Sequence, residues 1–132
     1  MQSLRAAVAS FARILIVEDD PAVRAALSEL LRERGYEVAC ATDGKDALAQ
    51  LGTRPAPSLI LLDLAMPVMD GWSFRAEQRR DPKLAAIPTI VLSASLAADP
   101  HALDGLEPDA ALVKPFEIDR LIAAMRRLCV AG

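Results

Sequence analysis

Three carboxylates, a hydroxyl and an ammonium follow closely on short apolar runs of this sequence. The residues are Glu18, Asp19, Asp63, Ser93 and Lys114. Carboxylates that gather in one place repel one another, so one must keep a proton unless a cation shares the site. Mg²⁺ suits such a site because it commonly binds one or two carboxylates together with waters and phosphate oxygens. A lysine ammonium and a serine hydroxyl can each contact a further phosphoryl oxygen. Residues of these types could therefore hold a phosphoryl group on or near a carboxylate.

Each of these residues alone has a simpler explanation. Acidic residues after a strand are often loop residues or helix caps, a serine there is often a turn former, and a single lysine is usually solvated. Asp20, the third acid after the first apolar run, has such a structural role because Pro21 follows it as a first helical residue. The functional interpretation rests on the combination, which requires one fold to bring these side chains together.

Unbroken apolar runs recur along the chain. Without alternating polar residues, such runs are typical of strands covered on both faces, as in a parallel sheet. The predicted strands span residues 14–17, 38–40, 59–62, 90–92 and 110–113, of which the second and the last have weaker patterns. Strands that alternate with helices through short connections predict an α/β fold with right-handed crossovers. We expect a flavodoxin-like, doubly wound (βα)5 fold with a five-stranded parallel sheet in the order 2-1-3-4-5.

Helical patterns fill the intervals between the strands. Between residues 23 and 31, apolar side chains have the spacing of one buried helix face, while charged residues such as Arg24 and Arg32 fall mainly on the opposite face. Further helices are expected around 47–51, from 70–71 to 81–82, over a short stretch from Pro100 to Leu106, and through 118–125. In such folds the functional crevice lies at the carboxyl ends of the strands. The reactive residues all follow strands and would meet at this edge.

The length of 132 residues fits one domain well and two domains poorly. We expect an N-terminal extension over residues 1–12, a domain over residues 13–129 and no output domain. The net charge of −3 argues against direct contact with nucleic acid, which requires a basic surface. Cys40 and Cys129 form no metal-type pair, which favours a reduced, cytoplasmic setting. The longest uncharged stretch, Leu84 to Ala98, is shorter than the roughly 18 residues of a membrane span. A monomer or weak dimer without membrane contact is expected.

Four motifs of the chain resemble those of response-regulator receiver domains, the phosphorylated switches of two-component signalling. They are Ile14-Leu15-Ile16-Val17-Glu18-Asp19, then Leu61-Leu62-Asp63-Leu64-Ala65-Met66-Pro67 with Met69-Asp70-Gly71, then Val91-Leu92-Ser93-Ala94, and Val113-Lys114-Pro115-Phe116. The motifs have the family's order and separations, and the resemblance covers about Arg13 to Arg127. The chain is similar in particular to stand-alone, chemotaxis-regulator-like members of the family.

The resemblance implies a role for each matching residue. Asp63 corresponds to the phosphoacceptor, Ser93 to the hydroxyl residue that binds the phosphoryl group, and Lys114 to the lysine that pairs with it. Mg²⁺, or alternatively Mn²⁺, would be held by Glu18, Asp19, Asp63 and the backbone carbonyl of Ala65. Family members accept the phosphoryl group from a sensor histidine kinase or a histidine phosphotransfer protein, and they catalyse part of their own dephosphorylation. The resemblance therefore implies a phosphorylation-dependent switch rather than an enzyme with a separate substrate.

Two departures from the family concern how the signal leaves the domain. Many receivers carry an aromatic residue three positions before the motif lysine, and its rotation is coupled to the strand-4 hydroxyl; here that position is Ala111. The expected fourth helix is short, contains Gly105 and is followed by Pro108. We therefore hypothesise that the output uses a different surface or a remodelled fourth helix. Because the sequence ends at Gly132, the expected output is contact with another protein, a phosphate-relay step, or a function within a larger hybrid protein.

Three other classes of function fit the sequence less well. A Mg²⁺-dependent aspartyl phosphatase of the haloacid-dehalogenase type would need an Asp-x-Asp pair after the first strand, whereas the first acid here is Glu18. A flavodoxin would need a phosphate loop of Ser, Thr or Gly at that place. A degenerate receiver that only binds partners would normally have lost its acidic residues, and here they are present.

Overall fold

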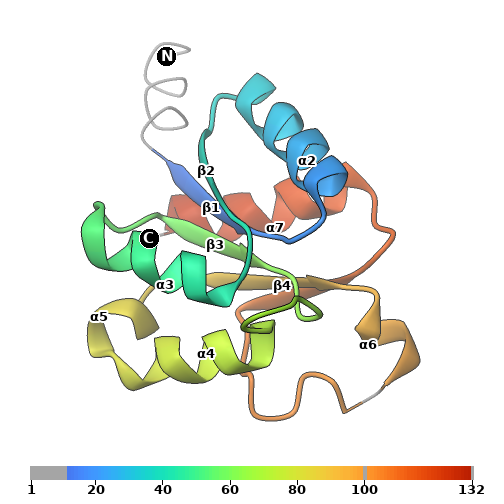
Figure 1. The fold of residues 1–132 in the computed structure, drawn as a ribbon. Coiled ribbons are helices and arrows are strands. Elements are labelled where there is room, and N and C mark those ends of the chain that lie inside the picture. Colours follow the sequence, from blue (N-terminus) through green and yellow to red (C-terminus); the bar gives the residue numbers. More distant parts are fainter. Residues whose placement is uncertain (1–11, 100, 132) are drawn as a thin grey trace.

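Five parallel strands form one sheet in the order β2-β1-β3-β4-β5. The computed structural model of the protein describes residues 12–99 and 101–131, and Figure 1 shows the sheet between two layers of helices. The strands are β1 (Arg13–Val17), β2 (Glu37–Ala41), β3 (Leu59–Leu62), β4 (Thr89–Ser93) and β5 (Ala110–Val113). The predicted flavodoxin-like α/β fold and its strand order are confirmed. The predicted extension, apart from Ala12, and the side chain of Cys129 lie outside the described residues.

Helices cover both faces of the sheet because successive strand residues point to opposite sides. The helices are α2 (Pro21–Glu33), α3 (Gly44–Thr53), α4 (Gly71–Arg80), α5 (Pro82–Ala85), α6 (Ser95–Ala98) and α7 (Ile118–Ala131). On one face, Ile14 and Ile16 of β1 share a core with residues of α2 and α7. On the other face, Leu15 and Val17 share a core with residues of α3 and α4 (Figure 1). Full burial of a leucine or isoleucine contributes about 1.5–3 kcal/mol, so these two cores fix the positions of the strand ends.

The loop from β1 to α2 ends in a side-chain cap. Asp20 Oδ1 accepts a hydrogen bond from Ala22 N (2.9 Å), and Pro21 is the first helical residue. Both residue types are favoured at these positions, because the carboxylate satisfies a free helix N–H and proline has none to satisfy. Asp20 therefore has the structural role that the sequence predicts.

The connection between β4 and β5 differs from the predicted helix over Pro100 to Leu106, and that prediction was wrong. A single helical turn, α6, follows β4 almost directly, and hydrogen bonds between residues three apart form turns over residues 101–106. Asp99 ends α6 with an extended backbone (φ −134°, ψ 108°), because a proline disfavours the helical conformation in the residue before it. Gly105 (φ 78°) and Glu107 (φ 45°) then interrupt any longer helix.

One face of α4 holds the chain from His101 to Asp109, which we call the 101–109 segment. Three α4 side chains, spaced three and four residues apart, donate to carbonyl oxygens of this segment. The bonds join Trp72 Nε1 to Ala102 (2.8 Å), Arg75 Nε to Leu106 (2.8 Å), Arg75 Nη2 to Glu107 (2.7 Å) and Arg79 Nη1 to Gly105 (2.7 Å). Side chains of α4, rather than a helix of its own, therefore hold this segment in place.

No helix in the described ranges is both long enough and apolar enough to cross a membrane.

Candidate functional site

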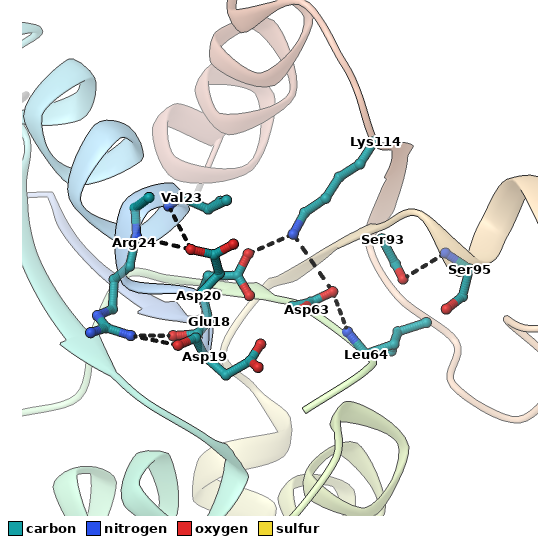
Figure 2. Close-up of polar contacts among 11 residues, drawn as sticks. Glu18, Asp19, Asp20, Val23, Arg24, Asp63, Leu64, Ser93, Ser95 and Lys114 are labelled. Atoms are coloured by element: carbon teal, nitrogen blue, oxygen red, sulfur yellow. Dashed lines mark hydrogen bonds and ion pairs between the residues drawn. The ribbon is translucent and has the colours of Figure 1, made fainter. Parts of the chain in front are cut away.

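The parallel register brings the predicted site residues to one edge of the sheet (Figure 2). Glu18 and Asp63 directly follow β1 and β3, Ser93 is the last residue of β4, and Lys114 directly follows β5. Strand β1 pairs with β3, β3 with β4, and β4 with β5. Groups that lie far apart in the sequence therefore share one end of four consecutive strands.

Glu18, Asp19 and Asp63 form a cluster of carboxylates. One oxygen of each side chain lies within 4.8 Å of the others, a spacing at which all three could hold one metal ion. Glu18 and Asp63 are buried, and Asp19 is half-buried. Asp63 Oδ1 also accepts a hydrogen bond from Leu64 N (2.9 Å). Carboxylates this close to one another repel unless a proton or a cation reduces their charge.

The Glu18 carboxylate has one satisfied and one unsatisfied oxygen. Oε1 accepts a hydrogen bond from Lys114 Nζ (2.6 Å), whereas Oε2 is buried without a hydrogen-bond partner among the described residues. Burial raises the pKa of Glu18, the hydrogen bond from Lys114 opposes that shift, and the Asp63 carboxylate adds to it. A buried anionic oxygen without a donor is unfavourable, and a hard divalent cation would satisfy it. The residues present therefore fit an ion such as Mg²⁺ or Mn²⁺.

The Lys114 ammonium lies beside two of the carboxylates. Nζ is 2.6 Å from Glu18 Oε1 and 3.7 Å from Asp63 Oδ1. The lysine is half-buried, so solvent and salt screen these charges less than they screen surface pairs. The ammonium offsets part of the negative charge and is within reach of an oxygen added to Asp63.

Ser93 and Ala65 lie at the same edge with different contacts. Ser93 is buried, and its hydroxyl oxygen accepts a hydrogen bond from Ser95 N (3.1 Å) at the start of α6 (Figure 2). The hydroxyl hydrogen can still donate to another acceptor. Ala65 is exposed in the loop after Asp63. The roles of all the site residues stay predictions.

Gly71 allows α4 to begin directly against the backbone of Asp63. A Cβ at this position would lie 2.3 Å from Asp63 O and 2.7 Å from Leu64 Cα. Gly71 N donates to Leu64 O (2.8 Å), and Asp70 Oδ1 caps the helix by accepting from Ser73 N (2.8 Å). The Asp70-Gly71 pair therefore ties the first turn of α4 to the main chain of the predicted phosphoacceptor.

Arg24 belongs to the exposed face of α2 by its helical position, but the structure places it next to the site. Its Nη1 donates to Glu18 O (2.8 Å) and to Asp19 O (3.2 Å), and the residue is half-buried. One signal in the sequence could have revealed this arrangement. A basic residue in the first turn of a helix is unfavourable because the helix dipole is positive there, so an arginine at that position suggests a partner outside the helix.

Comparison with known proteins agrees with this architecture. The family model of the response regulator receiver domain matches residues 14–126. The DNA-binding dual master transcriptional regulator RpaA of Synechocystis is 38% identical over 118 residues, which are 88% of this chain and 48% of RpaA. The chain therefore spans about half the length of that relative.

Two solved structures share the fold. The receiver domain of the sensor histidine kinase PA1611 from Pseudomonas aeruginosa, with a magnesium ion in its active site cleft, is 31% identical with a TM-score of 0.82, covering 90% of this chain and 98% of that one. Response regulator TrrA from Thermotoga maritima, in complex with Mg²⁺-BeF, is 32% identical with a TM-score of 0.77. The match covers 89% of this chain and 99% of the TrrA chain. Because the family model spans residues 14–126 and the fold agrees over 89–90% of the chain, this chain belongs to the response regulator receiver domain family of two-component signalling.

Proposed function

We propose that the protein is a phosphorylation-dependent signalling switch that accepts a phosphoryl group on Asp63. The observation that carries the proposal is the Asp63 carboxylate beside the Lys114 ammonium (3.7 Å) and within a cluster of three acids that fits a cation. The donor would be a phosphohistidine of a sensor histidine kinase or a histidine phosphotransfer protein. The target would be another protein, reached from the cytoplasm.

In the proposed transfer, a carboxylate oxygen of Asp63 attacks the phosphorus atom of the donor. The new bond joins Asp63 to phosphorus, the phosphorus–nitrogen bond breaks, and its electron pair returns to the imidazole of the donor. Asp63 needs no general base because its carboxylate is the nucleophile. Lys114 and Ser93 would each contact an equatorial phosphoryl oxygen. Bound Mg²⁺ or Mn²⁺, held by Glu18, Asp19, Asp63 and the Ala65 carbonyl, would supply further positive charge.

The phosphodonor would dock in a groove beside the site. The groove has a volume of about 270 Å³, runs between α2 and α7, and reaches Asp63 and Lys114 at one end. Val23 and Leu30 of α2 line it and are more than one-third exposed. A helix of the donor protein could cover this apolar surface while its histidine faces Asp63. Continuity between the groove and the carboxylate supports this part of the proposal.

The switch would depend on contacts that form only after phosphorylation. Reversing a two-state population from 1:99 to 99:1 needs about 5.5 kcal/mol, and charge-assisted hydrogen bonds from Lys114 and Ser93 supply roughly 1.5–3 kcal/mol each. A partner protein would therefore help to complete the switch. An output through the region from α6 to β5 is supported by three features. They are the short α6, the 101–109 segment, and the position of Ala111 in a small core with Leu64 and Trp72.

Mass spectrometry after incubation with acetyl phosphate and Mg²⁺ tests the proposal. The expected product carries one phosphoryl adduct that is absent with EDTA and absent in Asp63→Asn. Asp104→Asn is the control, because Asp104 is exposed in the 101–109 segment and pairs with His101 (3.1 Å), away from the cluster. A stable adduct in Asp63→Asn, or none in the unchanged protein, contradicts the proposal.

A further inference from the structure

Arg24 occupies an unfavourable place in its own helix. It is the fourth residue of α2, which begins at Pro21, and the positive end of the helix dipole repels a cation in this first turn. The guanidinium turns away from the helix and reaches back over the loop that carries the acidic pair (Figure 2). The contacts of the guanidinium with that loop, rather than any benefit to the helix, therefore explain why an arginine occupies this position.

One nitrogen of Arg24 binds two successive carbonyl oxygens of this loop. Nη1 donates to Glu18 O at 2.8 Å and to Asp19 O at 3.2 Å. Each bond fixes the orientation of one peptide plane, because a planar peptide turns as a unit. Two fixed neighbouring planes set the directions in which the Glu18 and Asp19 side chains leave the main chain.

The rest of the loop is anchored on either side of these two bonds. Glu18 N donates to Ala41 O of β2 (3.0 Å), and Asp20 accepts from Ala22 N to cap α2 (2.9 Å). Between those two anchors, Arg24 binds the carbonyl oxygens of Glu18 and Asp19. Without it, the peptide planes of both acids would lose this restraint.

We infer that Arg24 is a positioning residue that orients Glu18 and Asp19 toward Asp63 for binding of the divalent cation. The inference rests on the proposed function. Supporting contacts outside the ligands themselves typically change metal affinity by about 10–100-fold when removed. The charge of Arg24 acts in the opposite sense, because a cation near the acidic cluster repels a second one. Loss of positioning weakens binding, whereas loss of charge alone strengthens it, so the sign of the effect separates the two roles.

Isothermal titration calorimetry on the full chain measures whether Mg²⁺ affinity falls or rises in Arg24→Met and Arg24→Lys. Arg32→Met is the matched control, since Arg32 lies on the same helix and donates to the carbonyl of Val38 (3.2 Å), away from the acidic pair. Thermal unfolding in EDTA identifies the temperature range in which each variant is folded, and the titrations are run within it. Arg24→Lys keeps the charge and serves as the second variant should Arg24→Met fold poorly.

We expect Mg²⁺ affinity to fall about tenfold in Arg24→Met and to fall also in Arg24→Lys, whose ammonium lacks the planar fork of a guanidinium. Affinity in Arg32→Met should match that of the unchanged protein. Unchanged or tighter binding in folded Arg24→Met overturns the inference and leaves the proposed function intact. Absence of Mg²⁺ binding in the unchanged protein overturns the proposed function itself, together with this inference.

Discussion

Lys114 lies closer to Glu18 than to Asp63: its ammonium is 2.6 Å from Glu18 Oε1 and 3.7 Å from Asp63 Oδ1. A cation bound to the unpartnered Oε2 of Glu18 would share the charge of this carboxylate with Lys114 and weaken the hold of Glu18 on the ammonium, which also lies within reach of an oxygen on Asp63. The lysine therefore connects cation binding to the chemistry proposed at Asp63.

Glu18→Gln should make the cation-free protein less sensitive to pH. Burial raises the pKa of Glu18, so this group contributes stability below its unfolded pKa, and the contribution is lost as the pH rises through the folded pKa. A glutamine does not titrate. The free energy of unfolding of Glu18→Gln, relative to the unchanged protein, should therefore rise as the pH increases through the weakly acidic range. Urea denaturation in EDTA at several pH values measures it.

Added Mg²⁺ should reverse this difference. A ligand that binds only the folded state stabilises it increasingly with concentration, and Glu18→Gln lacks a charged ligand. Glu37→Gln, at an exposed residue paired with Arg13, serves as the control. If the free energy of unfolding in EDTA had the same pH dependence in Glu18→Gln and in the unchanged protein, burial of Glu18 would not explain that dependence.

Val68→Gly should stabilise the protein. Val68 has a φ of 67°, is 79% exposed, and is the central residue of a tight turn closed by a hydrogen bond from Met69 N to Pro67 O (2.7 Å). Such γ-turns are rare, and a β-branched residue in this conformation costs about 1–3 kcal/mol. After the added chain entropy of glycine, a gain of about 1 kcal/mol in the free energy of unfolding is expected. Val68→Ala, which keeps a Cβ, should gain less; a loss of stability in Val68→Gly would exclude strain at this turn.

Gly71→Ala should destabilise the protein and impair phosphorylation. The added Cβ would meet Asp63 O at 2.3 Å and Leu64 Cα at 2.7 Å, and main-chain atoms cannot move aside without shifting α4 or the loop. We expect a loss of about 1–3 kcal/mol and slower adduct formation with acetyl phosphate. Gly52→Ala is the control, because nothing lies within 4 Å of a Cβ there, and alanine should stabilise this helical position by about 0.5–1 kcal/mol. Equal effects of the two substitutions would refute the role of close approach.

Arg75→Met should loosen the 101–109 segment. Arg75 is 6% exposed and binds the carbonyl oxygens of Leu106 and Glu107, which would lose a charged donor. A loss of about 3 kcal/mol is expected, with faster hydrogen exchange in the segment. Arg80→Met, at an exposed residue paired with Glu77 (3.1 Å), should change stability by less than about 0.5 kcal/mol. Unchanged exchange in the segment would show that other contacts hold it.

The fold was predictable because three of its strands, β1, β3 and β4, contain unbroken apolar runs that alternate with helical patterns. The β-α alternation predicts a parallel, doubly wound sheet, and five units at this chain length favour the order 2-1-3-4-5. The polar residues after β1, β3, β4 and β5 indicated the edge at which they meet. Local capping rules account for Asp20 and Asp70. The path of the chain after β4 was not predictable in the same way. It depends on the end of α6 at Asp99, before a proline, and on hydrogen bonds from α4 side chains to the 101–109 segment.

Long-range contacts between side chains and the main chain leave little trace in the sequence. The bonds of Arg75 to Leu106 and Glu107 join residues about thirty positions apart. The two bonds of Arg24 to the acidic loop also go to carbonyl oxygens, which are present at every residue. Because every residue has a carbonyl oxygen, no sequence motif identifies the partner of such a donor. Only the unfavourable helix position of Arg24 suggested that its side chain binds outside the helix.

The contact between α4 and the carbonyl of Ala102 provides an intrinsic optical probe. Trp72 is the only tryptophan in the sequence, and its indole N–H makes that contact. Its emission wavelength depends on the polarity and hydrogen bonding around the ring, so unlabelled protein can report in real time whether the 101–109 segment stays on α4 when Asp63 is modified.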